Sequence, residues 1–128
     1  MKKSGILHPG ICELLAASGH TDYITISDRG FPVPDGPGRI DLALVDDIPT
    51  VLDVLRAIAD EWALDRVIIT AEMTEVSPQR VAELRSLLGA VPLDIVPHVT
   101  FKHLCATAKA TIRTADTTAY ANLIIVSG

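Results

Sequence analysis

GHTDYITISDRGFPVP, at residues 19–34, combines a strand pattern with two polar residues that flank it. Apolar and polar side chains alternate at its centre, which predicts a β-strand over residues 22–27. His20 lies just before this strand, and Asp28 lies just after it. Strands of an α/β sheet present their carboxyl ends to the ligand crevice, so Asp28 is expected to lie at such a crevice.

Helical and strand patterns alternate along the rest of the chain. Residues 66–70 (RVIIT) form a nearly continuous apolar run, as expected for a strand that is covered on both faces. Further strands are predicted over 40–44, 93–96, 110–113 and 123–126, helices over 11–18, 51–62, 78–88 and 100–108, and a short strand or arm over 2–7. This alternation predicts one layered α/β domain over residues 1–128, with a mainly parallel central sheet flanked by helices.

Local signals mark where several helices should begin and end. Thr50 and Asp53 have the spacing of a capping box. Ser77 followed by Pro78 predicts a helix start, with the serine side chain as the cap and the proline in the first turn. Gly19 suits the left-handed position after the first helix, which a glycine adopts without steric penalty.

Composition limits the classes of function. The chain has 128 residues, of which 48% are hydrophobic and 4% aromatic. No apolar run approaches the roughly 20 residues of a membrane span, so the apolar excess is expected to pack against other subunits of an oligomer. The net charge of −5, without a basic stripe, argues against nucleic acid and anionic membrane surfaces as partners.

The N-terminal segment and the cysteines indicate a compartment. MKKSGILHPG at residues 1–10 lacks the long apolar segment of a signal peptide. Cys12 and Cys105 lie in apolar, helix-like surroundings, so they are expected to be buried thiols rather than a disulfide. Both observations predict a cytoplasmic protein.

Four motifs together resemble the D-ribose pyranase family of sugar mutarotases. They are GHTD at 19–22, SDRGFPVP at 27–34, RIDLAL at 39–44 and YAN at 120–122, in order and with compatible spacing. The resemblance implies an isomerase that interconverts β-D-ribopyranose and β-D-ribofuranose, with neither a cofactor nor a metal. It also implies the family's α/β fold and a ring-like homo-oligomer, a decamer or pentamer, with the monosaccharide site at a subunit interface near YAN.

The resemblance also implies roles for individual residues. His20 of GHTD would be the proton donor. Ring opening protonates the ring oxygen while the anomeric hydroxyl loses its proton, and imidazole suits this because it titrates near neutrality. Lys102 lies four residues after His98 and would share a helix face with it. The residues expected to contact the sugar are Asp28, His98, Lys102, Tyr120, Ala121 and Asn122.

Ordinary structural interpretations compete with these roles. His20 could be a cation near a helix C-terminus, and Asp28 could cap a turn. Arg29 stands beside Asp28 and could pair with it, which would alter the sugar preference. Two other functions stay open at this point, namely a fucose-type mutarotase with a similar histidine and fold, and a non-catalytic sugar-binding subunit.

Overall fold

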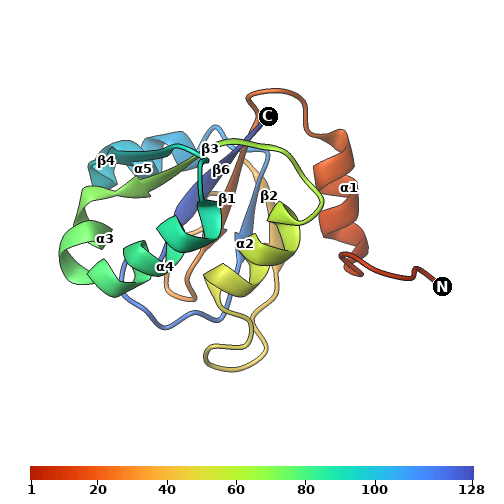
Figure 1. Cartoon of the computed structure of the whole chain (residues 1–128), viewed down its shortest axis with the longest axis horizontal. Coiled ribbons are helices and arrows are strands. Elements are labelled where there is room, and N and C mark those ends of the chain that lie inside the picture. Colours follow the sequence, from red (N-terminus) through yellow and green to blue (C-terminus); the bar gives the residue numbers. More distant parts are fainter.

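Six strands form one sheet, and five helices surround it (Figure 1). The computed structural model describes the whole chain, Met1–Gly128. The strands are β1 (Tyr23–Ser27), β2 (Gly38–Asp41), β3 (Leu64–Thr70), β4 (Leu93–Val96), β5 (Ala110–Arg113) and β6 (Leu123–Ser127). The helices are α1 (Pro9–Ala17), α2 (Val51–Ala59), α3 (Ala71–Val76), α4 (Pro78–Leu88) and α5 (His98–Cys105). Across the sheet the strands lie in the order β2-β5-β1-β6-β3-β4.

Five strands run in one direction, and β6 runs in the other. β1 pairs parallel with β5, β2 with β5, and β3 with β4, whereas β6 pairs antiparallel with both β1 and β3. The predicted α/β fold with a mainly parallel sheet is therefore confirmed. β6 is reversed because residues 114–122 contain no helix that could return the chain to the opposite edge of the sheet, so β6 begins at the edge where β5 ends.

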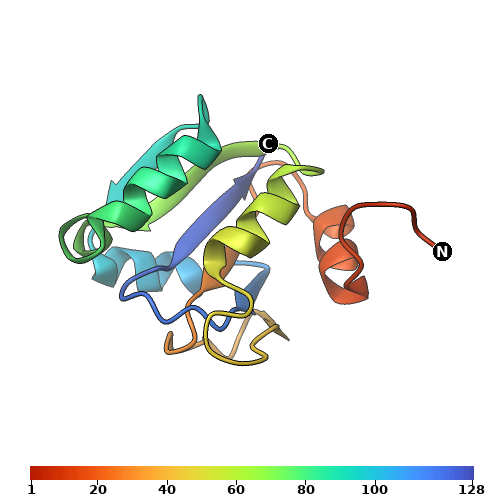
Figure 2. The ribbon, with the colours of Figure 1, turned by 60° about the horizontal axis from the view of Figure 1, so that its bottom comes forward.

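The helices cover the two faces of the sheet unequally. Figure 2 shows α2 and α4 over one face and α5 over the opposite face. An apolar cluster of 20 buried residues includes side chains from α1, α2 and α4, and a second cluster of six includes side chains from α5. In β6, Leu123 and Ile125 belong to the larger cluster and Ile124 and Val126 to the smaller one, as the two-residue period of a strand requires.

The helix-start signals are confirmed in part. The capping box at α2 forms, because the Thr50 hydroxyl accepts the Asp53 amide at 3.2 Å and the Asp53 carboxylate accepts the Thr50 amide at 2.9 Å. Pro78 begins α4 as predicted. The predicted Ser77 cap is wrong, since the Ser77 hydroxyl instead donates to the carbonyl oxygen of Ala119 at 2.7 Å.

Two other local predictions are wrong. Gly19 does not take the left-handed conformation: Ser18 ends α1 with extended backbone, and Thr21 is the left-handed residue of the next turn, with φ 68°. The strand predicted over 40–44 is displaced to β2, Gly38–Asp41. Its partner β5 ends at Arg113, so the chain leaves the sheet once the Leu42 amide has donated to the Arg113 carbonyl at 2.9 Å.

The segment after β3 contains a helix that the sequence pattern did not predict. The Thr70 side chain accepts the amide of Met73 at 3.0 Å, which starts α3 directly at the end of the strand. α5 begins at His98, two residues earlier than predicted, and residues 2–7 form no strand. None of the helices is both long and apolar enough to cross a membrane.

Candidate functional site

A pocket of about 240 Å³ lies at the sheet edge where β1 ends and β6 begins. Three segments form its wall: the loop after β1, the first residue of α5 and the loop before β6. The lining residues are Asp28, Gly30, Phe31, Pro32, His98, Ala119, Tyr120 and Asn122. The volume is below the roughly 300–1,000 Å³ of pockets that take drug-sized ligands, so the pocket suits a smaller molecule.

Most of the predicted sugar-contact residues lie in this pocket. The reversed β6 brings the YAN triplet to the carboxyl end of β1, beside Asp28. Ala121 differs from its neighbours, because its side chain is buried in the larger apolar cluster and its amide donates to the Thr118 carbonyl at 3.3 Å. The four predicted residues that line the pocket are Asp28, His98, Tyr120 and Asn122.

The backbone of Asp28 is hydrogen-bonded to the side chain of Asn122. The Asp28 amide donates to the Asn122 side-chain oxygen at 2.8 Å, and one Asp28 carboxylate oxygen accepts the Gly30 amide at 3.0 Å. Burial raises the pKa of Asp28 above its ordinary value, although hydrogen bonds from Gly30, Phe31 and Asn122 oppose the shift. The result is a half-buried carboxylate, held in one orientation, that can accept hydrogen bonds from hydroxyl groups.

Aromatic contacts fix the ring of His98. The ring meets Tyr120 edge-to-face at a centroid distance of 5.3 Å and lies nearly parallel to Phe101 at 6.3 Å. The backbone amide of His98 donates to the Glu72 carboxylate at 3.1 Å, which holds the start of α5 in place. The ring Nδ1 atom is buried and makes no hydrogen bond within the chain, so the pocket wall holds a polar atom in need of a partner.

His20 lies at the opposite end of β1 from this pocket. It is exposed in the turn at residues 19–22, and Asp22 and Asp28, which flank β1, are roughly 20 Å apart at about 3.3 Å per residue. The turn is fixed to the end of β6, since the Thr21 amide donates to the Ser127 carbonyl at 2.8 Å and the Ser127 amide to the Asp22 carbonyl at 3.0 Å. One chain therefore does not bring His20 to the other site residues.

Two further residues that the sequence singled out, Lys102 and Arg29, do not line the pocket of one chain. Lys102 is exposed on α5 and is not among the lining residues of the pocket, although it follows His98 on the same helix. Arg29, which could have paired with Asp28, instead bonds the Asp46 carboxylate through its guanidinium at 2.9 Å. This ion pair is exposed, and it leaves the Asp28 carboxylate free of a cationic partner.

The cysteines lie outside the pocket. Cys105 is buried on α5, where burial raises the pKa of its thiol to about 11, and Cys12 on α1 is half-buried. Both thiols are free, as predicted. No group of three or more His, Cys, Asp or Glu side chains is arranged to hold a metal ion.

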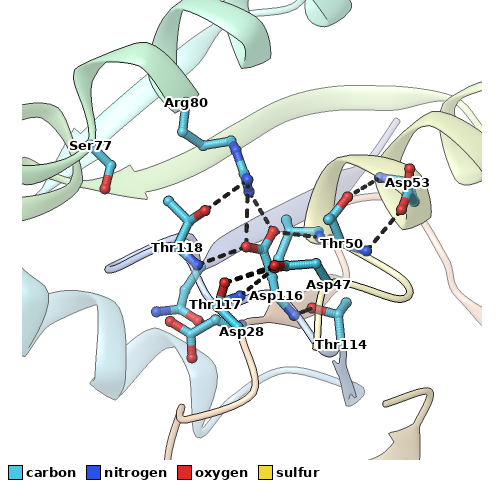
Figure 3. A network of polar contacts seen from close by, with 12 residues as sticks. Asp28, Asp47, Thr50, Asp53, Ser77, Arg80, Thr114, Asp116, Thr117 and Thr118 are labelled. Carbon is cyan, nitrogen blue, oxygen red and sulfur yellow. Dashed lines mark hydrogen bonds and ion pairs between the residues drawn. The ribbon is translucent and has the colours of Figure 1, made fainter. Parts of the chain in front are cut away.

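A buried ion pair between Arg80 and Asp116 lies next to the loops that form the pocket (Figure 3). The Asp116 side chain is fully buried and accepts hydrogen bonds from both terminal nitrogens of Arg80 and, at 2.9 Å each, from the Val51 and Thr118 amides. Burial alone raises the pKa of Asp116, but the bonds from Arg80 and the two amides outweigh it and hold the pKa below its ordinary value. Asp116 is thus a buried carboxylate at neutral pH.

Sequence reasoning missed this network. TADTT at residues 114–118 is a polar run between two strands, a pattern that indicates an ordinary loop rather than a buried charge. Arg80 and Asp116 are 36 residues apart, and no spacing rule links a helix arginine to a distant loop aspartate. The other missed pocket residues, among them Phe31 and Ala119, have no chemical signature that marks them as lining a site.

Comparison with known proteins identifies the family. The model of the RbsD / FucU transport protein family matches residues 1–128. The chain belongs to the RbsD / FucU family. Two RbsD / FucU relatives illustrate the match: the D-ribose pyranase of Geobacillus kaustophilus is 44% identical over 128 residues, covering 100% of this chain and 94% of that protein. The D-ribose pyranase of Coprothermobacter proteolyticus is also 44% identical, covering 100% and 98%.

Two solved structures agree with the fold described above. Bacillus subtilis RbsD complexed with D-ribose has a TM-score of 0.96 and 41% identity, covering 100% of this chain and 98% of that one. The fucose mutarotase from Streptococcus pneumoniae in complex with L-fucose has a TM-score of 0.81 and 19% identity, covering 95% and 93%. At 19% identity, the similarity to the fucose mutarotase shows a shared fold and nothing more.

Proposed function

We propose that this chain is a D-ribose pyranase, an isomerase that interconverts β-D-ribopyranose and β-D-ribofuranose. One observation carries the proposal: the pocket that joins Asp28, His98, Tyr120 and Asn122 occurs in a chain that matches proteins named D-ribose pyranase over its whole length. These side chains present a carboxylate, an imidazole, a phenol and a carboxamide, all of which can bond the hydroxyls of a sugar.

Ring opening moves one proton onto the ring oxygen and one proton off the anomeric hydroxyl, and the proposal assigns the donor of the first. The ring oxygen gains a proton as its bond to the anomeric carbon breaks, while the anomeric hydroxyl loses its proton and becomes the aldehyde. The open chain then recloses through a different hydroxyl to give the furanose. His20 donates the first proton, and the pocket residues hold the remaining hydroxyls so that the chain recloses in place.

His20 must come from a second copy of the chain if it acts at this pocket. It lies at the far end of β1, so the proposed site combines the pocket of one chain with the His20 turn of its neighbour. Exposed apolar side chains beside the pocket support such an interface: Val99 follows His98 and is 67% exposed, and Val76 precedes Ser77 and is 56% exposed. We therefore propose a homo-oligomer, a ring-like decamer or pentamer with its sugar sites between subunits.

The proposal includes a cytoplasmic, cofactor-independent enzyme. The two free thiols, Cys12 and Cys105, fit a reducing compartment. Ring opening and closing are proton transfers without any change in oxidation state, so side chains that titrate near neutrality meet the chemical need. Lys102 is exposed on the same helix as His98, and we propose that it contacts the sugar only in the assembled oligomer.

Adding the protein to D-ribose is expected to accelerate exchange between the pyranose and furanose forms with no metal or nucleotide present. Saturation transfer between the anomeric proton signals measures the exchange rate with and without protein. L-Fucose under the same conditions is the matched control for the sister activity. Unchanged ribose exchange together with accelerated fucose exchange would replace the ribose assignment by a fucose-type mutarotase.

Ribose affinity is expected to fall as the pH drops through the pKa of Asp28, which burial raises above 3.8. The ionised carboxylate accepts hydrogen bonds from two hydroxyls, and protonation removes acceptor capacity, so the loss appears on the acid side. Titration of ribose into the protein between pH 7 and pH 4 measures it, with circular dichroism to check that the protein stays folded.

Asp28→Asn identifies the group responsible for this acid loss. The variant should bind ribose more weakly at neutral pH and lose the part of the acid dependence that Asp28 causes. The pocket geometry is otherwise kept, so any acid dependence that remains in the variant does not belong to Asp28. An acid limb of the same size and midpoint in Asp28→Asn would contradict the assignment to Asp28.

A further inference from the structure

We propose that the buried Arg80–Asp116 ion pair is the positioning device of the pocket, because it sets the spacing between the loop that carries Asp28 and the loop that carries Asn122. Neither Arg80 nor Asp116 lines the pocket, so both act through other residues. The inference rests on the proposed function only for its ribose readout.

The carboxylate of Asp116 shapes the loop before β6. One of its oxygens accepts the Thr118 amide at 2.9 Å, and the Thr118 carbonyl accepts the Ala121 amide at 3.3 Å. These two bonds define the turn that delivers Asn122 to the pocket. Arg80 strengthens the same turn, since its second terminal nitrogen donates to the Thr118 hydroxyl at 2.9 Å (Figure 3).

The backbone of Asp116 holds the other loop. Its carbonyl oxygen accepts the Arg29 amide at 3.1 Å, and the preceding amide, that of Asp28, donates to the Asn122 side chain at 2.8 Å. Asp116 therefore contacts both pocket loops, one through its carboxylate and the other through its main chain. A displacement of Asp116 changes the distance between Asp28 and Asn122, on which any two-point contact with a sugar depends.

Burial makes the arginine necessary for this arrangement. The Asp116 side chain has no solvent exposure and that of Arg80 has 13%, so removing either partner leaves a charge without compensation in the interior. The guanidinium reaches the carboxylate and the Thr118 hydroxyl at once, because its nitrogens form a rigid planar fork. A lysine ammonium at this position is a point charge that can neutralise Asp116 without fixing the loop.

Selective binding loss distinguishes positioning from general stabilisation. A purely structural role would appear in the melting temperature, because weakening one partner of a buried ion pair leaves the other charge poorly compensated in the interior. A positioning role would instead raise the dissociation constant for ribose while leaving the exchange rate at saturating ribose near native, because His20 is untouched. The amides of Asp28 and Ala121 would also exchange faster with deuterium, since their hydrogen bonds depend on the loop spacing.

Thr118→Val is the central variant, because it removes the Arg80–Thr118 bond without leaving Asp116 unpaired. We expect it to raise the dissociation constant for ribose by about tenfold, the usual scale for a lost bond to a charged group. Thr118→Ser keeps the hydroxyl and should bind ribose as the native protein does. Arg80→Lys should fold, since the charge is kept, yet bind ribose more weakly. Arg85 is an exposed arginine on the same helix, so Arg85→Met controls for the loss of an arginine.

The amide measurement separates this inference from the proposed function. Faster exchange at Asp28 and Ala121 in Thr118→Val, but not in Thr118→Ser, supports the positioning role even if the native protein does not act on ribose. Native-like amide protection and native-like ribose binding in both Thr118→Val and Arg80→Lys would overturn it, and a lower melting temperature alone would then assign the pair to stability.

Discussion

Replacing His20 by alanine is expected to slow the exchange of ribose forms by roughly 10²-fold or more, the usual contribution of general acid–base catalysis. Ribose binding should change little, because the hydrogen-bonding residues of the pocket stay in place. Saturation-transfer rates at saturating ribose measure the chemical step, and calorimetric titration measures the affinity.

Matched variants make this result specific to His20. His103→Ala removes an exposed histidine on α5 and should exchange ribose at the native rate. Asp28→Ala and Asn122→Ala should weaken ribose binding first, because each loses hydrogen bonds already made in the ground state. A His20→Ala protein with the native exchange rate would make His20 an ordinary cation near a helix end, and the proton donor would then have to be sought at His98.

Mixing two impaired variants is expected to restore part of the activity at ribose concentrations too low to saturate Asp28→Ala. His20→Ala lacks the proton donor, Asp28→Ala lacks a sugar contact, and the two positions lie at opposite ends of β1. If each site takes His20 from one chain and Asp28 from its neighbour, random mixed oligomers contain both native residues in about one site in four. The test is to co-express the two variants with different affinity tags, isolate oligomers that carry both tags, and compare their exchange rate with that of each variant alone.

A second mixture provides the control. Asp28 and Asn122 line the same pocket and bond to each other within one chain, so Asp28→Ala mixed with Asn122→Ala should restore nothing. Restoration only in the mixture that contains His20→Ala identifies a site shared between chains. Mixed oligomers of His20→Ala and Asp28→Ala that are no more active than the single variants would contradict the shared site. So would a native protein that is fully active and is a monomer by light scattering.

The sequence pattern predicted strand bounds correctly where the apolar run and the buried strand coincide. The bounds of β4 and β5 match their predicted ranges, and β6, a continuous apolar run that is buried on both faces, differs by a single residue. β2 was misplaced because a strand's length depends on its partner: Leu42 and Leu44 continue the alternation after β5 has ended. α3 escaped detection because its six residues are too few for a helical period to be recognised.

The candidate site was predictable in its chemistry but not in its arrangement. Asp28 could be placed at the carboxyl end of a strand from the pattern alone, and the structure has it in a pocket there. The meeting of Asp28 with Asn122 depends on the reversed direction of β6, which no local pattern encodes. The buried charge of Asp116 depends on Arg80 from a distant helix, so it becomes visible only in three dimensions.

The position of β6 also affects the order in which the sheet forms during folding. β1 and β3 do not pair with each other, and β6 alone bridges the half of the sheet made of β2, β5 and β1 to the half made of β3 and β4. Without residues 123–127, β1 and β3 have no strand between them to pair with, and the pocket lacks the segment that carries Asn122. Pairings between residues so distant in sequence form slowly, so we expect the pairing of β6 with β1 and β3 to be a late step of folding.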